Sequence, residues 1–491
     1  MNAVRSRVVA WGSSQTGILT IICLGVFSTA LDQTVVNTAL PTVMLELKIP
    51  LTDLDSASWI ITGYLVSYTV AMPLAGRLSD VHGRVRIFQL ALLVFAIGSA
   101  LVAVAPNFPW IVSARVLQAA GGGATVPIAM AMAVAAVQPR HRGVTLGLVA
   151  AAAEAGSVLG PLYGGAIIEW IGWRWIFWFD VPQSLLLMVL LAVLPNRPNR
   201  EAKMDYLGAL LLGAALLIIT AALSQRAIFS LESIVPYLML AVGVGLIAIL
   251  VRVEKRAEQP LVAAFLHRSK AFVIANAVQF VVGIALIIGL VAVPLMANTV
   301  MEKPTWEAAL HLVRLTAAIP PGALIGGYIM RWTGVRAATI AGLVLIGVGL
   351  ISMGGWETEV GQFELTAPLV TAGLGFGLVI PPISVTALSA APSHYWGTAA
   401  SLITAARMVG MALGLAALST WGIEQFYSMT ADVTIGGSYE ETAAPLIEAG
   451  VTVFQSLFRV AGTFSLLAIL PALSMKLEDT GMTESRSEGL S

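Results

Sequence analysis

The feature that most constrains this chain is a series of apolar segments, each about 20 residues long and nearly free of charged side chains. An α-helix rises about 1.5 Å per residue, so a segment of this length crosses a hydrocarbon core of ~30 Å. The sequence therefore predicts an all-α, multi-pass membrane protein. We place fourteen transmembrane helices at residues 16–38, 57–76, 86–105, 110–133, 143–168, 174–194, 206–224, 233–252, 271–296, 306–330, 336–353, 366–388, 396–422 and 453–475.

Composition excludes several other classes of protein. Apolar residues make up 58% of the chain and Asp, Glu, Lys and Arg only 11%, against roughly 25% charged residues in a soluble protein. The formal net charge is zero, so the basic surface that binds nucleic acid is missing. A single cysteine, Cys23, and five dispersed histidines provide neither a disulfide framework nor metal-ligand spacing. Because the chain also lacks a Walker motif, we expect no enzyme, no ATP-driven pump, no metal and no cofactor.

The orientation follows from Lys and Arg, which collect in cytoplasmic loops. If the N-terminus is cytoplasmic, the inner segments hold a large group of basic residues between Arg77 and Arg336, whereas the outer segments hold only Lys48, Arg174, Arg226 and Lys303. An even number of helices returns the C-terminus to the same side. We therefore expect a protein of the plasma (inner) membrane with both termini in the cytoplasm and an uncleaved first helix.

A weak internal repeat indicates two similar halves. Residues 76–86 and 327–336 each place two glycines seven residues apart, a charged residue four positions after the first glycine, and an Arg after the second. Two six-helix bundles related by pseudo-symmetry, with two extra helices between them, account for this pattern. We divide the chain into a first bundle at 1–195, two inserted helices with cytoplasmic flanks at 196–270, a second bundle at 271–477 and a disordered cytoplasmic tail at 478–491.

Four charged side chains lie deep within the predicted helices. Glu154 and Arg407 each stand ~16 Å inside their helices, and Asp32 and Arg115 share a depth nearer the outer surface. Charges at such depth are expensive and are functional by default. Arg cannot lose its proton, so each Arg needs an acid, and we expect Asp32 to pair with Arg115 and Glu154 with Arg407. A purely structural salt bridge remains the alternative reading of these pairs.

Glycine recurs every four residues on the helix that carries Glu154. Gly156, Gly160 and Gly164 leave one face without side chains, and Pro161 removes a backbone donor within that face. With Gly165 these residues form the pattern GxxxGPxxGG. Tight helix packing without a transport role is the alternative interpretation.

These patterns resemble those of the major facilitator superfamily. GxxxGPxxGG resembles its antiporter motif, and residues 31–41 resemble LDxTVVNVALP of its fourteen-helix drug:proton antiporter branch, departing only at Thr38. Residues 76–86 resemble motif A, and residues 115–123 resemble motif B with Ala119 in place of a glycine. The resemblance implies proton-coupled alternating access, with a cytoplasmic gate formed by Gly76, Asp80, Gly83 and Arg84.

Within this branch the surroundings of Glu154 and Arg407 resemble those of mycobacterial efflux transporters for triacylglycerides and drugs. That resemblance implies that Asp32 and Glu154 couple transport to protons, that the substrate is a lipid or a lipophilic drug, and that a periplasmic lipid-carrying lipoprotein is a partner. We expect the helix at 396–422 to continue outward through Trp421, Phe426 and Tyr427, which would guide the substrate out. A long outer segment of about 25–30 residues follows, against the usual 2–8 in helical bundles.

The sequence thus favours a proton-driven exporter of lipophilic molecules, with the proton gradient as its only energy source. A general multidrug:proton antiporter with no lipid role is one alternative. A transport-inactive scaffold or sensor is another, although a scaffold has little reason to keep Asp32, Glu154 and Arg407 at depth. The antiporter motif disfavours an importer.

Overall fold

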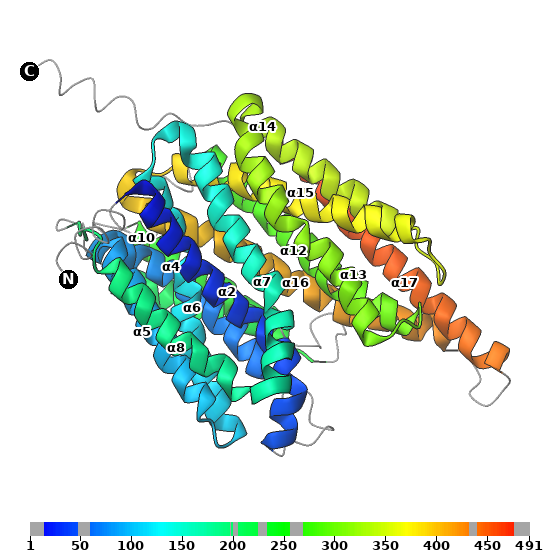
Figure 1. Cartoon of the computed structure of the whole chain (residues 1–491). Helices are drawn as coiled ribbons and strands as arrows, with labels where there is room; N and C mark the ends of the chain where they lie inside the picture. Colours follow the sequence, from blue (N-terminus) through cyan, green and yellow to red (C-terminus); the bar gives the residue numbers. More distant parts are fainter. Residues whose placement is uncertain are drawn as a thin grey trace, which may run out of the picture.

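A computed structural model describes residues 14–47, 59–196, 198–199, 205–223, 233–255, 269–431 and 439–475. Every regular element within these ranges is helical (Figure 1). The first half contains α2 (Gln15–Glu46), α4 (Trp59–His82), α5 (Arg84–Ala103), α6 (Phe108–Ala136), α7 (Arg142–Ile171) and α8 (Arg174–Leu191). The later helices are α9 (Tyr206–Leu223), α10 (Val235–Glu254), α12 (Lys270–Thr299), α13 (Thr305–Ala317), α14 (Ile319–Met353), α15 (Gln362–Ser389), α16 (Trp396–Thr430), α17 (Tyr439–Leu467) and α18 (Ile469–Ala472). Two short 3₁₀ helices, Pro139–His141 and Ser393–Tyr395, precede α7 and α16.

The number of membrane crossings agrees with the sequence-based prediction once one long span is divided. By length and composition, 13 helical spans in the described chain can cross a membrane, and one of them, Glu307–Met353, has 47 residues. At about 1.5 Å per residue it is more than twice as long as a bilayer core is thick. The helix direction changes inside it at Gly334, whose φ is 78° and ψ 168°. Division at Gly334 gives fourteen crossings, so the predicted all-α membrane fold is confirmed.

Gly334 has a counterpart in the first half. Gly83, between α4 and α5, has a φ of 97°, and these two residues are the second glycines of the repeated sequence pattern. L-amino acids with a side chain rarely adopt positive φ, whereas glycine does so freely. The repeat therefore marks the same backbone turn in each half.

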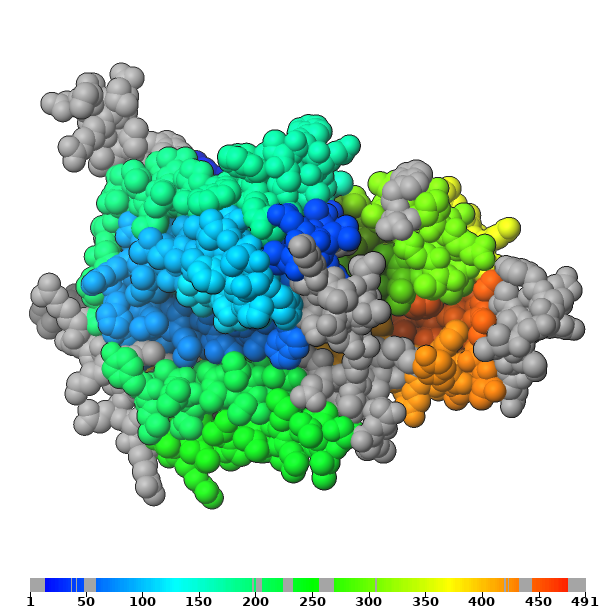
Figure 2. Space-filling view, turned by 90° about the horizontal axis from the view of Figure 1, so that it is seen from below, coloured from blue at the N-terminus to red at the C-terminus, as the bar shows by residue number. Residues whose placement is uncertain are grey.

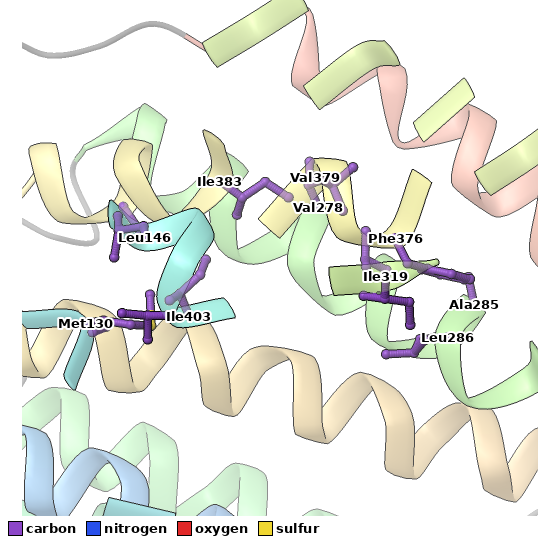
Figure 3. Close-up of a cluster of buried hydrophobic side chains, with 14 of the residues drawn as sticks. Met130, Leu146, Val278, Ala285, Leu286, Ile319, Phe376, Val379, Ile383 and Ile403 are labelled. Carbon is purple, nitrogen blue, oxygen red and sulfur yellow. The ribbon is translucent and has the colours of Figure 1, made fainter. Parts of the chain in front are cut away.

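The two halves contact each other mainly at their inner ends, which the sequence predicts to face the cytoplasm. The largest apolar cluster contains Met130 and Leu146 from the first half together with Ile383 and Ile403 from the second (Figure 3). A separate cluster at the outer ends of α2, α4, α5, α6 and α8, which includes Val36, consists only of first-half residues. The inner ends of the two halves therefore share an apolar core, whereas the outer end of the first half has a core of its own.

The helices α9 and α10 lie along the flank of the bundle and appear green in Figure 2, the view from below. On α9, Leu212 packs near Leu74 of α4, and Leu223 contacts Ala416 of α16, so this helix touches both halves. In contrast, α10 packs on α9 and is mostly exposed, because only 17% of its most apolar 18-residue stretch is buried. The division of the chain at residues 195 and 270 stays a prediction.

The connection between the last two long helices differs from the prediction. α16 does continue outward, to Thr430, but α17 begins at Tyr439, so most of the expected irregular segment up to about residue 452 is helical. In Figure 1 the first turns of α17 project from the bundle. Apolar side chains on this part of α17, such as Ile447 and Phe454, pack in the same cluster as Phe426 of α16, and this burial explains why the segment is ordered. The predicted tail at 478–491 lies outside the described residues.

Candidate functional site

The most deeply buried ion pair joins α2 to α6. Asp32 and Arg115 are 0% and 1% exposed, and Arg115 Nη1 donates a hydrogen bond of 2.9 Å to Asp32 Oδ2. Gln118, one turn further along α6, donates from Nε2 to Asp32 Oδ1 at 3.0 Å. Both carboxylate oxygens are therefore satisfied. Removal of either charge would leave the other buried and uncompensated, at a cost of about 3–5 kcal/mol.

A wider polar network extends from this pair to a residue that the sequence analysis missed. Gln118 Nε2 also donates to Ser99 Oγ at 2.7 Å, and the Ser99 hydroxyl donates to Asp180 Oδ2 at 3.2 Å. Asp180 lies on α8 and is 5% exposed. It is a third acid within the membrane, and its presence inside the apolar segment 174–194 was the signal that could have identified it.

The second ion pair joins the two halves. Arg407 Nη1 of α16 donates to Glu154 Oε1 of α7 at 3.0 Å, and both side chains are 14% exposed. They line a cavity of about 30 Å³, which has room for about two water molecules. Two polar atoms of this lining, Arg407 Nε and Gln279 Oε1, have no hydrogen-bond partner among the described residues. The cavity thus holds the ion pair within a mainly apolar lining, and it is too small for a lipophilic substrate in this state.

Two tyrosines of α4 lie between the ion pairs. The Arg115 guanidinium stands 4.0 Å from the centre of the Tyr64 ring, and the Tyr64 ring stacks on Tyr68 with centres 5.8 Å apart. Both tyrosines are buried, and the Tyr68 side chain is close enough to Glu154 and Arg407 to interact with their charges. The two charge sites are therefore connected through α4.

Asp80 joins the halves at their inner ends. Its Oδ1 accepts a hydrogen bond of 2.9 Å from the backbone N–H of Gly397, and its Oδ2 accepts from Thr398 N at 2.8 Å and from Thr398 Oγ1 at 3.1 Å. The carboxylate thus caps the N-terminus of α16, where unpaired N–H groups and the helix dipole favour a negative charge. The sequence placed Asp80 in a predicted cytoplasmic gate. It did not predict that the main partner of Asp80 is a helix end of the other half.

Neighbouring residues allow this close contact. Arg84 Nη2 lies 3.3 Å from Asp80 Oδ1 and donates to the carbonyl oxygen of Ser393 at 2.5 Å. A Cβ atom on Gly76 would collide with the carbonyl oxygen of Gly397, and one on Gly397 would collide with that of Gly76. Only glycine at both positions lets the helices meet. These contacts therefore hold the inner ends of the two halves together in the structure.

Comparison with known proteins identifies the family to which this chain belongs. Residues 22–415, well over half of the chain, match the sequence model of the Major Facilitator Superfamily. The chain belongs to the major facilitator superfamily.

Curated relatives support this assignment along most of the chain. A triacylglyceride transporter of Mycobacteroides abscessus is 35% identical over 444 residues, which cover 86% of this chain and 84% of the relative. A triacylglyceride transporter of Mycolicibacterium hassiacum is 36% identical over 421 residues, 82% of this chain and 78% of the relative. The chain is therefore a membrane transporter and not an enzyme.

Solved structures of more distant members share the fold. The human organic anion transporter MFSD10 is 14% identical with a TM-score of 0.65, and the match covers 93% of this chain and 99% of that protein. The proton:xylose symporter XylE is 15% identical with a TM-score of 0.64, covering 94% and 95%. At these identities the similarity concerns the fold alone, and it confirms the predicted fold family.

In this major facilitator superfamily transporter the glycine face of α7 packs within the first half. A Cβ atom on Gly156 would collide with the carbonyl oxygen of Phe27, and one on Gly160 with the Thr34 side chain of α2. A Cβ atom on Gly164 would come within 2.5 Å of Val35. A Cβ atom on Gly165 would meet nothing within 4 Å, and Pro161 is exposed within a helix that continues past it. Three glycines thus serve the contact of α7 with α2, and the other two motif residues do not.

The outer ends of α12, α16 and α17 enclose an apolar pocket of about 570 Å³, within the usual size range of ligand sites. Two of the three residues predicted for substrate exit, Phe426 and Tyr427, line it, and their rings meet edge to face at 6.1 Å. The third, Trp421, does not line the pocket and is 38% exposed. Further lining comes from Leu295, Leu418, Leu446, Ile447, Val453, Phe454 and Leu457.

Proposed function

We propose that this transporter exports lipophilic molecules, triacylglycerides among them, across the plasma membrane in exchange for protons. The observation that carries the proposal is the ion pair between Glu154 and Arg407, which spans the two halves and lines a small cavity. An acid that links moving parts can exchange a proton when the parts separate. The names and the identity of the mycobacterial relatives support the choice of lipid.

Proton coupling would work through the charge of Glu154. While Glu154 is ionised, it holds Arg407 across the interface, and protonation removes that attraction. A motion of α7 against α16 that separates the pair or admits water would change how readily Glu154 holds its proton. A membrane potential of 100 mV contributes about 2.3 kcal/mol per charge moved, so a modest motion is enough for useful coupling.

Alternating access would use the cytoplasmic gate. Capping of α16 by Asp80 and the contact between Gly76 and Gly397 keep the inner ends together in the present state. Release of these contacts would open the central cavity to the cytoplasm and the inner leaflet. With an N-terminus in the cytoplasm, this cycle moves the substrate outward.

The apolar pocket between α12, α16 and α17 supports a lipid as substrate. Its lining is almost wholly apolar, and it lies where the outer ends of α16 and α17 extend, so acyl chains could leave the bundle there without meeting water. Lipid that reaches the outer ends would pass to a periplasmic lipid-carrying lipoprotein. This partner and the cytoplasmic position of both termini belong to the proposal.

Transport in proteoliposomes tests the proposal. Purified transporter is reconstituted with an internal pH dye, and a fluorescent triacylglyceride or a fluorescent cationic drug is supplied under an imposed pH gradient. We expect gradient-dependent movement of the triacylglyceride accompanied by opposite movement of protons, with faster lipid release when lipoprotein is added outside. Drug movement without lipid movement would support a general multidrug antiporter, and movement of neither would support a scaffold.

A further inference from the structure

The cluster around Asp32 contains one more acid than it has bases. Asp32 is neutralised by Arg115 at 2.9 Å. Asp180 is equally buried and has no ion pair with a base in the described part of the chain. Its carboxyl group accepts a hydrogen bond of 3.2 Å from the Ser99 hydroxyl, and Ser99 in turn accepts from Gln118, which also donates to Asp32. A lone carboxylate at this depth, beside a second carboxylate, is too costly to remain ionised.

We propose that Asp180 is a second proton-binding residue of this transporter, which shares its proton with Asp32 and exchanges it with the outer aqueous side during transport. Two buried carboxyl groups beside a single guanidinium leave one negative charge uncompensated, and one proton held by the pair removes it. The arrangement holds that proton in place, because Asp32 already accepts from Arg115 and Gln118, and Asp180 accepts from Ser99. This inference deepens the proposed proton coupling and rests on it only for the exchange step.

The surroundings of Asp180 come from five helices. The titratable and charged groups near it are Asp32 on α2, Tyr64 on α4, Arg115 on α6 and Tyr163 on α7, and the α5 neighbour is the neutral Ser99. Arg115 is thus the single cation of the described cluster, and it faces two acids. The proton on the acid pair and the position of Arg115 are therefore linked, because loss of the shared proton leaves two negative charges for one guanidinium.

Position along the helix favours exchange with the outside. Asp180 is six residues from the start of α8, about 9 Å at 1.5 Å per residue, and α8 begins on the outer side. Through Tyr64 and Tyr68 the cluster also connects to the pair of Glu154 with Arg407. Separation of Glu154 from Arg407 can therefore change how tightly the Asp32–Asp180 pair holds its proton.

Infrared difference spectroscopy of the whole purified transporter tests the site directly. In an E154Q background we expect a protonated-carboxyl C=O band at neutral pH that disappears in D180N and shifts in D180E. Asn has the shape of a protonated Asp and still accepts from Ser99, so D180N should fold, which size-exclusion chromatography checks. E169Q, which changes an exposed acid of α7, is the matched control and should keep the band. A band that persists in D180N, or no band in the parent protein, overturns the proposal.

Proton counting separates this inference from the proposed function. In proteoliposomes we expect D180N to move one proton fewer per substrate than the wild type and to lose the pH dependence that the pair contributes, while D180E retains both. Equal proton counts in wild type and D180N would rule out exchange at Asp180. If the wild type moves no protons at all, the proposed antiport fails, and the infrared band still decides whether Asp180 holds a proton.

Discussion

Glu154 and Arg407 belong to different halves and lie at their interface, so their contact changes if the two halves move. Asp32 and Arg115 both belong to the first half, and their pair is fully buried. A pair within one half can survive a rigid-body motion of the halves, whereas a pair between halves cannot. This difference gives the two acids different expected roles.

For Glu154, we expect Glu154→Gln to abolish proton-driven export and to preserve downhill exchange of substrate. The amide still fits the site and accepts a hydrogen bond from Arg407, but it cannot take up a proton. Paired measurements of internal pH and substrate efflux check this, with Glu169→Gln as the exposed control on the same helix. Wild-type coupling in Glu154→Gln would remove this carboxylate from the mechanism and leave Asp32 and Asp180.

Asp80 provides a second test at the scale of residues. Asp80→Asn should destabilise the cytoplasm-closed state, because hydrogen bonds to a charged group are worth about 1.5–3 kcal/mol and the amide loses that charge. We expect slower transport with substrate binding largely retained. A cysteine introduced into the lining of the inner cavity should also react faster with a thiol reagent added on the cytoplasmic side. Export at the wild-type rate together with unchanged labelling would refute the gate.

Among the helices, α7 has two contact faces with different consequences. Its glycines pack on α2 within the first half, and its N-terminal part packs on α14 of the second half, where Gly147 lies against Ala323 and Gly143 against Met330. The glycine pattern therefore keeps α2 and α7 together as a unit, and the N-terminal end of α7 belongs to the interface between the two halves.

The glycine face can be tested by adding volume to it. Gly160→Val should separate α7 from α2 and destabilise the transporter by about 1–3 kcal/mol, the usual cost of overpacking, because Thr34 and the Leu31 carbonyl leave no space. The matched change Gly165→Val meets open space and should leave the apparent melting temperature nearly unchanged. Equal thermal shifts for the two variants would show that the close contact does not matter for stability.

The outer extension of α16 and α17 gives a prediction about substrate choice. Removal of two turns from the facing ends, residues 424–430 and 440–446, should damage lipid delivery more than efflux of a small drug, because it removes Phe426, Tyr427 and Leu446 from the apolar pocket. Parallel lipid and drug efflux assays check this. Equal losses for both substrates would point to a role in folding.

At the scale of the whole molecule, the two halves are joined at their inner ends through an apolar core and through the cap of α16 by Asp80. The flanking helices α9 and α10 differ from each other in what they contact. α9 bridges α4 and α16, and α10 lies outside it, distant from the ion pairs and exposed on much of its surface.

We therefore expect polar substitutions on α10 to leave proton coupling unchanged. Leu238→Ser and Val242→Ser alter side chains that are 55% and 53% exposed and that do not contact the charge sites. Proton uptake in proteoliposomes is the measurement, and the control is Leu212→Ser on α9, which packs toward α4 and should reduce stability. Loss of coupling in a well-folded α10 variant would place this helix in the transport path.

The sequence by itself determined the class of fold, the number of crossings and the depth of the charged side chains. These follow from the length and polarity of local segments, because a bilayer imposes a fixed thickness and excludes unpaired charge. The positive φ of Gly83 and Gly334 was likewise local, and the repeated glycine pattern marked it. Depth along a helix also identified Glu154 and Arg407 as partners worth testing.

Tertiary structure alone decided which elements meet. That Asp80 caps the first turn of α16, more than 300 residues away, depends on how the two halves dock, and no local pattern encodes it. The same holds for Asp180, whose importance comes from Asp32 and Ser99 on two other helices, and for α17, which stays helical beyond the expected boundary because α16 offers an apolar surface. Local polarity determines which residues must be buried or paired. Only the packing of distant segments determines which partners they meet.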